Sequence, residues 1–214
     1  MVDYKEIARA IKLILIANIL FFVNFNLTIN MGLLNLCFDI IPDFVGYILI
    51  IKSLKILMTY DKTAKIVLPF GYVMMALSIF SINAPFTQDM FYTLNAFYVM
   101  NFIGLITVPI NIYLTYQVYT IIANLCNKID EATGNCVKKF RNFKIIVTVS
   151  NQIILSSYYF YYFINPSNTY VSTIIPIVII VINLIALIYF FIASLSAYWL
   201  FNNYEPVQID QSAA

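Results

Sequence analysis

Asp39 and Asp43 are the residues whose type and spacing come closest to a chemical site, because they stand four positions apart in the otherwise apolar stretch 30–57. Paired carboxylates at the surface of a membrane attract cations or protons, which predicts an outer vestibule. The alternative interpretation is structural, and we favour it. Pro42 suits the first turn of a helix and Asp43 suits its positive N-terminal end, while Asp39 would lie in a turn.

Amide side chains inside apolar segments form a second set of candidates. They are Asn101, Asn111, Asn151, Gln152 and Asn183. One interpretation is that they line a central polar cavity for a neutral or weakly charged solute. The other, which we favour, is that these residues and the small residues near them let helices approach closely and form hydrogen bonds across the bundle.

Several classes of chemistry receive no support from the sequence. There is no histidine, and the three cysteines, Cys37, Cys126 and Cys136, form no Cys-x-x-Cys pair. The common zinc-binding patterns need such ligands, so we predict no metal site and no cofactor. No nucleophile elbow, phosphate-binding loop, dinucleotide-binding glycine motif or His-Glu-x-x-His motif occurs. We therefore predict no catalytic residue and do not expect an enzyme.

The composition is that of a membrane protein. Of the 214 residues, 62% are hydrophobic and 10% are charged, against about 45–50% and about 25% in soluble domains. Apolar runs of roughly the length that crosses a bilayer predict an all-α fold, a six-transmembrane-helix bundle in one domain over 1–204, followed by a polar tail over 205–214. The predicted spans are 13–29, 43–58, 66–82, 91–114, 145–164 and 171–195.

Two connections in this scheme carry further expectations. The run 30–41 is too apolar for an ordinary loop and too short for a span, so we expect an interfacial or re-entrant piece over 30–37 and a turn over 39–41. The fourth helix is expected to extend beyond 114, as far as 122. Between the fourth and fifth spans, Thr133, Gly134 and Asn135 are expected to form a turn between helix extensions.

The basic residues predict the orientation. If the N-terminus lies in the cytoplasm, all 12 lysines and arginines fall in cytoplasmic segments, as the positive-inside rule requires. They are Lys5, Arg9, Lys12, Lys52, Lys55, Lys62, Lys65, Lys128, Lys138, Lys139, Arg141 and Lys144. We therefore expect a multi-pass protein of the plasma membrane with both termini in the cytoplasm.

The segment IIPDFVGYILI resembles part of a group of uncharacterised multi-spanning membrane proteins of low-GC Gram-positive bacteria. Those proteins carry Pro-Asp-Phe, then Val or Ile, then Gly-Tyr, after their first span. The similarity covers about residues 35–51 of this sequence. It implies a membrane location and assigns no substrate.

Two functions remain open from the sequence. The first is a protein that binds or passes a small solute, or the membrane subunit of a transporter. The alternative is a membrane interaction protein without transport activity, such as an assembly, immunity or sensing subunit. The expected partners are the lipid bilayer and a membrane subunit or cytoplasmic ATPase, and no nucleic acid.

Overall fold

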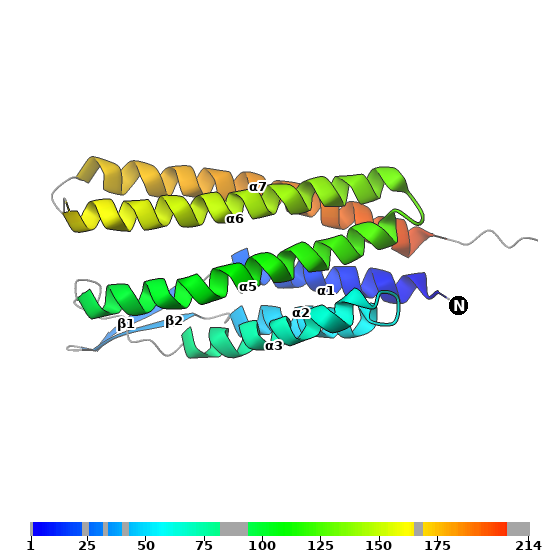
Figure 1. Ribbon diagram of the computed structural model, residues 1–214, viewed down its shortest axis with the longest axis horizontal. Coiled ribbons are helices and arrows are strands. Elements are labelled where there is room, and N and C mark those ends of the chain that lie inside the picture. Colours follow the sequence, from blue (N-terminus) through cyan, green and yellow to red (C-terminus); the bar gives the residue numbers. More distant parts are fainter. Residues whose placement is uncertain are drawn as a thin grey trace, which may run out of the picture.

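The computed structural model describes residues 2–22, 26–31, 34–39, 43–81, 94–164 and 169–204. This part of the chain contains a hairpin of two strands and six helices, which confirms the predominantly helical class (Figure 1). The strands are β1 (Asn26–Met31) and β2 (Leu34–Asp39). The helices are α1 (Tyr4–Phe22), α2 (Asp43–Leu57), α3 (Thr63–Ser81), α5 (Leu94–Cys126), α6 (Glu131–Ile164) and α7 (Thr169–Asn203).

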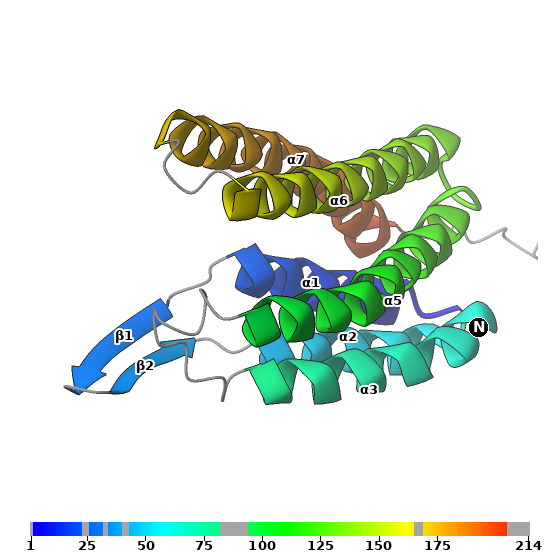
Figure 2. The same cartoon turned by 60° about the vertical axis from the view of Figure 1, so that its left-hand side comes forward.

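The six described helices contact one another in a closed cycle. Helix α1 packs on α2, α2 on α3, α3 on α5, α5 on α6, α6 on α7, and α7 returns to α1. Figure 1 and Figure 2 show these helices running side by side along the long direction of the molecule. A closed cycle of helices surrounds a shared interior, and residues from α1, α2, α5 and α7 meet there.

Basic residues are concentrated toward one end of the bundle, which we call the basic end. The start of α1, the α2–α3 turn, the α5–α6 turn and the end of α7 all lie at this end, whereas the hairpin lies at the opposite end (Figure 1). The lysines and arginines of the chain belong to these turns or to the helix halves that adjoin them. The charge pattern of the sequence therefore corresponds to one end of a folded bundle.

Three aspartates at the basic end cap helix N-termini. Asp3 Oδ1 accepts hydrogen bonds from the backbone N–H groups two and three residues further on, at 3.0 and 3.2 Å. Asp61 Oδ1 accepts one from the N–H of Thr63 at 2.8 Å. Asp130 accepts hydrogen bonds from the hydroxyl and the N–H of Thr133, which lower the pKa of its carboxyl below the ordinary value. These contacts satisfy N–H groups that a helix start leaves without partners.

The predicted end of the first span, residue 29, is wrong, and the segment expected to lie in the membrane interface forms strands, while its interfacial position stays a prediction. Helix α1 ends at Phe22, and the described residues between 26 and 39 form antiparallel strands. The physical reason is a polar and apolar alternation with the period of a strand. The pairing joins residues of like polarity, for example Asn30 with Asn35 and Ile29 with Leu36. Asp39 is the last residue of β2, and residues 40–42 lie outside the described part.

The turn between α5 and α6, which correspond to the fourth and fifth predicted spans, is also displaced from its predicted position. It occupies residues 127–130, and α6 begins at Glu131, before the residues 133–135 that were expected to form the turn. Gly134 lies inside α6, where a Cβ atom would be 1.8 Å from Asn127 Oδ1 and 3.0 Å from the carbonyl oxygen of Ala123. The glycine permits close approach of α6 to the end of α5. It does not form the turn.

Other helix ends extend beyond the apolar runs. Helix α1 begins at Tyr4, before the predicted span 13–29, α5 continues to Cys126, past the expected residue 122, and α7 continues to Asn203, past the predicted span 171–195. Helix α2 begins at Asp43, as predicted, and α3 covers Thr63–Ser81. Hydropathy locates the part of a helix that suits lipid, whereas the backbone hydrogen bonding of these helices continues through polar residues.

Within the described residues, two segments are long and apolar enough to cross a membrane. They are Ile106–Cys126 of α5 and Val181–Asn203 of α7, and Thr63–Ser78 is a shorter apolar stretch. Large apolar side chains also point outward, since Ile146 is 62% exposed and Ile188 is 55% exposed. Together these features favour association with a membrane.

Candidate functional site

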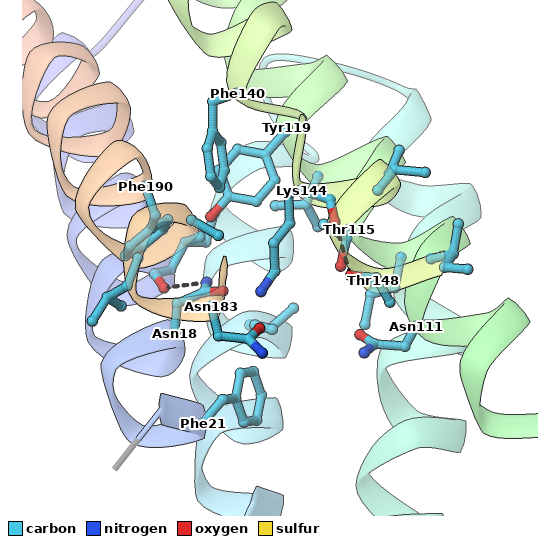
Figure 3. Close-up of a pocket in the computed structure, with 18 of the residues that line it drawn as sticks. Asn18, Phe21, Asn111, Thr115, Tyr119, Phe140, Lys144, Thr148, Asn183 and Phe190 are labelled. Atoms are coloured by element: carbon cyan, nitrogen blue, oxygen red, sulfur yellow. Dashed lines mark hydrogen bonds between the residues drawn. The ribbon is translucent and has the colours of Figure 1, made fainter. Parts of the chain in front are cut away.

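A cavity of about 430 Å³ lies inside the cycle of helices, and we call it the central cavity. Its size falls in the range of small-molecule sites, about 300–1,000 Å³. Residues of α1, α2, α5, α6 and α7 line it. The polar lining residues are Asn18, Asp43, Asn111, Thr115, Lys144, Thr148 and Asn183, and the aromatic ones are Phe21, Tyr47, Tyr119, Phe140 and Phe190 (Figure 3).

The central cavity is closed toward the basic end by apolar side chains. On each contributing helix, the face that lines the cavity continues toward that end at spacings of three or four residues. The continuing residues of α1, α2, α5 and α7, each at most 2% exposed, form what we call the inner core: Ile7, Ile11, Leu54, Leu57, Ile122, Ala193 and Ala197. A solute in the cavity is therefore separated from the basic end by a packed apolar layer.

Lys144 is the basic residue of the central cavity. Its side chain extends between Asn183 on one side and Asn111 on the other (Figure 3). The sequence predicts Lys144 in the connection before the fifth span. The structure instead places it about 20 Å along α6 from Glu131, at a rise of about 1.5 Å per residue. Within the described part of the chain, Lys144 Nζ has no ion-pair or hydrogen-bond partner.

The structure brings together some of the amide residues singled out in the sequence. Asn111 and Asn183 line the central cavity. Asn151 Nδ2 donates a hydrogen bond to Asn183 Oδ1 at 3.0 Å, so Asn151 joins α6 to α7 next to the cavity. Gln152 is half-buried and is not part of the lining. Asn101 lies in α5, and its side chain is outside the described part.

The two aspartates have different positions. Asp43 lines the central cavity as the first residue of α2, where the positive end of the helix dipole stabilises a carboxylate. Asp39 ends β2, and its side chain lies outside the described part. A vestibule formed by both carboxylates therefore stays a prediction.

Aromatic rings form one wall of the central cavity. The ring centroid of Phe140 lies 4.9 Å from that of Tyr119, 5.6 Å from that of Phe190 and 5.8 Å from that of Tyr189. This group, which joins α5, α6 and α7, is called the aromatic wall below. Tyr119 is 3% exposed, and its hydroxyl lies beside the side chain of Ser194 in α7. The wall gives a ligand apolar surface beside polar groups.

Sequence reasoning missed Asn18 and Lys144 as lining residues. Asn18 lies on α1, and its Nδ2 donates to the carbonyl oxygen of Ile14 at 2.9 Å. The available signal was the spacing of Phe140, Lys144 and Thr148, which puts all three on one face of a continuous helix. That signal depends on knowing that α6 begins well before Phe140.

No protein-family model, curated protein or solved structure matches this chain. The resemblance at residues 35–51 stays a prediction, and the cavity carries the functional argument. No group of three or more His, Cys, Asp or Glu side chains placed to hold a metal ion occurs in the described ranges.

Proposed function

We propose that this protein is a six-span protein of the plasma membrane whose central cavity binds a small solute, as a transporter or as the membrane subunit of one. The observation that carries the proposal is the cavity of about 430 Å³ with polar and charged groups inside an apolar bundle. Polar and ionisable groups are costly inside a membrane, and they typically mark substrate or ion pathways there. Close packing by small residues and amide hydrogen bonds would not by itself leave a space of this size, because packed interiors contain few voids larger than a water molecule.

The proposed orientation places the basic end in the cytoplasm. Positively charged residues are retained on the cytoplasmic side of multi-spanning proteins, and the described lysines and arginines lie toward that end. Helices of 33–35 residues, such as α5, α6 and α7, are about 50 Å long and exceed a hydrocarbon core of about 30 Å. The polar first part of α6, which carries the lysines and the arginine of that helix, then projects toward the cytoplasm.

The direction of solute access follows from the inner core. The cavity is closed by buried apolar residues on the side of the basic end. In the proposed orientation, the solute therefore enters the cavity from the outer side of the membrane. Passage into the cell would require the inner core to separate, as in alternating access around a central site.

The orientation can be tested by labelling cysteines with an impermeant maleimide. In a chain whose Cys37, Cys126 and Cys136 are replaced by serine, Asn30→Cys reports the hairpin and Val2→Cys, where the native side chain is 49% exposed, reports the basic end. We expect intact cells to be labelled at Asn30→Cys, and Val2→Cys to be labelled after lysis alone. The cysteine-free chain is the control. Labelling of Val2→Cys on intact cells would contradict the orientation.

Solute binding can be tested by filling the central cavity. Thr148 lines the cavity, whereas its neighbour Val149 is 39% exposed and absent from the lining. Thr148→Trp and Val149→Trp therefore place the same bulk inside and outside the cavity. We expect mass spectrometry of purified protein to recover a retained small solute from the wild type and from Val149→Trp, and at least tenfold less from Thr148→Trp.

Two results would contradict solute binding in the central cavity. The first is the absence of any retained solute from the wild-type protein purified directly from its membrane. The second is equal recovery from Thr148→Trp and Val149→Trp while both remain folded by circular dichroism.

A further inference from the structure

Lys144 places a positive charge in the central cavity without direct contact to a carboxylate in the described ranges, although Asp43 lies on the same lining. Its ammonium lies in a cavity bordered by the apolar inner core and the aromatic wall. Within the described ranges it forms no ion pair or hydrogen bond through Nζ. A desolvated lysine without a partner is unfavourable, and ionisable residues inside membrane bundles are normally paired. An anionic group of a bound ligand could therefore make the direct contact with Lys144 that no described side chain makes.

The other groups of the central cavity do not take this role. Asp43 is its carboxylate, but it belongs to the start of α2 and already has an interaction of its own. Asn18, Asn111 and Asn183 are neutral amides, and the threonine hydroxyls are also neutral. A ligand that carries a negative charge would pair with Lys144 and be held by these neutral groups.

The lining favours a carboxylate over a phosphate. Lys144 is the single basic residue among the lining residues, and the lining also carries the Asp43 carboxylate, so the cavity suits no more than one further negative charge. A phosphate monoester carries about −1.5 to −2 charges at neutral pH and is typically bound by arginines or a helix N-terminus.

The remainder of the ligand faces aromatic surface. Phe140 and Phe190 belong to the aromatic wall, and Phe21 lies on the opposite side of Lys144 from Phe140 (Figure 3). Rings of this kind bind apolar or aromatic groups. Resting on the proposed solute-binding function, we propose that the central cavity binds a small monocarboxylate, with its carboxylate on Lys144 and its apolar body on the aromatic wall.

The proposal is tested by titrating the purified full chain with matched probes in a calorimeter. Benzoate and benzamide differ in the charge of one group, as do 4-methylpentanoate and its amide. We expect at least one carboxylate to bind about tenfold or more tightly than its amide, because hydrogen bonds to charged groups are about twice as strong as neutral ones. Lys144→Met and Lys144→Gln should reduce that carboxylate to the affinity of its amide.

Lys139→Met is the matched control, because Lys139 is an exposed residue of the same helix outside the cavity lining. It should bind the carboxylate as the wild type does. Failure of both carboxylates to bind more tightly than their amides, or full binding by a folded Lys144→Met, would overturn the proposal. Retention of a neutral or cationic solute that Thr148→Trp excludes would overturn it while leaving the solute-binding function intact.

Discussion

Replacing Phe140 with alanine is expected to lower the free energy of unfolding by about 3–5 kcal/mol, the usual cost of truncating a buried phenylalanine. Phe140 is 1% exposed and its ring contacts Tyr119, Tyr189 and Phe190. The truncation removes contacts among α5, α6 and α7 and leaves a void that these helices cannot fill without moving. Denaturant titration of the purified protein in detergent, followed by circular dichroism, measures the change.

Phe143→Ala is the control for this prediction, because it removes the same ring from a half-buried position on the same helix. Phe143 has one ring contact among the described residues, at 5.8 Å from the centroid of Tyr189. We expect a cost below about 2 kcal/mol there, since a partly exposed side chain leaves a smaller void. Equal costs for the two variants would show that the aromatic wall does not hold the three helices together.

Phe140→Ala should also change ligand binding, and its effect should differ from the effect of Lys144→Met. Phe140→Ala enlarges the central cavity, so bulkier apolar bodies should gain affinity relative to smaller ones. Lys144→Met leaves the apolar wall in place and should weaken carboxylates alone. The two variants therefore separate the apolar and ionic parts of recognition.

The helices could be predicted from the sequence because their apolar runs are long and are separated by polar residues. Hydropathy measures compatibility with lipid, and helix continuity depends on backbone hydrogen bonds, so the two agree in the middle of a helix and diverge at its ends. Asp130 illustrates the difference, since it caps α6 by accepting hydrogen bonds from residues that hydropathy assigns to a loop.

The hairpin was predictable in principle but was missed. The residues from Asn26 to Met31 alternate polar and apolar, which is the period of a strand. The proximity of an apolar helix and the position of Asp39 near Pro42 favoured an interpretation in terms of membrane spans. Its register could not be derived from hydropathy, because register depends on the pairing of individual residues across the two strands.

The central cavity could be predicted in part. The amides of Asn111 and Asn183 were suggested by their positions inside apolar segments, and both line the cavity. Lys144 was missed because charge patterning treats every lysine as a marker of the cytoplasmic side. Whether a lysine near a span points to water or into the bundle depends on the rotation of its helix, which requires knowing where the helix packs.

Gly134→Ala is expected to destabilise the protein by about 1–3 kcal/mol, the usual cost of overpacking, despite a gain of about 0.5–1 kcal/mol in helix propensity. A Cβ at this position would lie 1.8 Å from Asn127 Oδ1 and 3.0 Å from the carbonyl oxygen of Ala123. The exposed neighbour provides a control, since Asn135→Ala should change stability by less than about 0.5 kcal/mol. Chemical unfolding in detergent gives each value.

The double variant Asn127→Ala/Gly134→Ala shows whether the Asn127 side chain or the Ala123 backbone clashes with the methyl group that Gly134→Ala adds. Asn127 Oδ1 is buried without a hydrogen-bond partner among the described residues, so Asn127→Ala alone removes an unsatisfied acceptor and should cost little. In the double variant the 1.8 Å contact disappears and the 3.0 Å contact with the backbone of Ala123 remains. We therefore expect the double variant to be more stable than Gly134→Ala by about 1 kcal/mol, a coupling typical of residues in contact. If the costs of Asn127→Ala and Gly134→Ala were additive, the backbones of α5 and α6 would set how closely the two helices approach, and the Asn127 side chain would not.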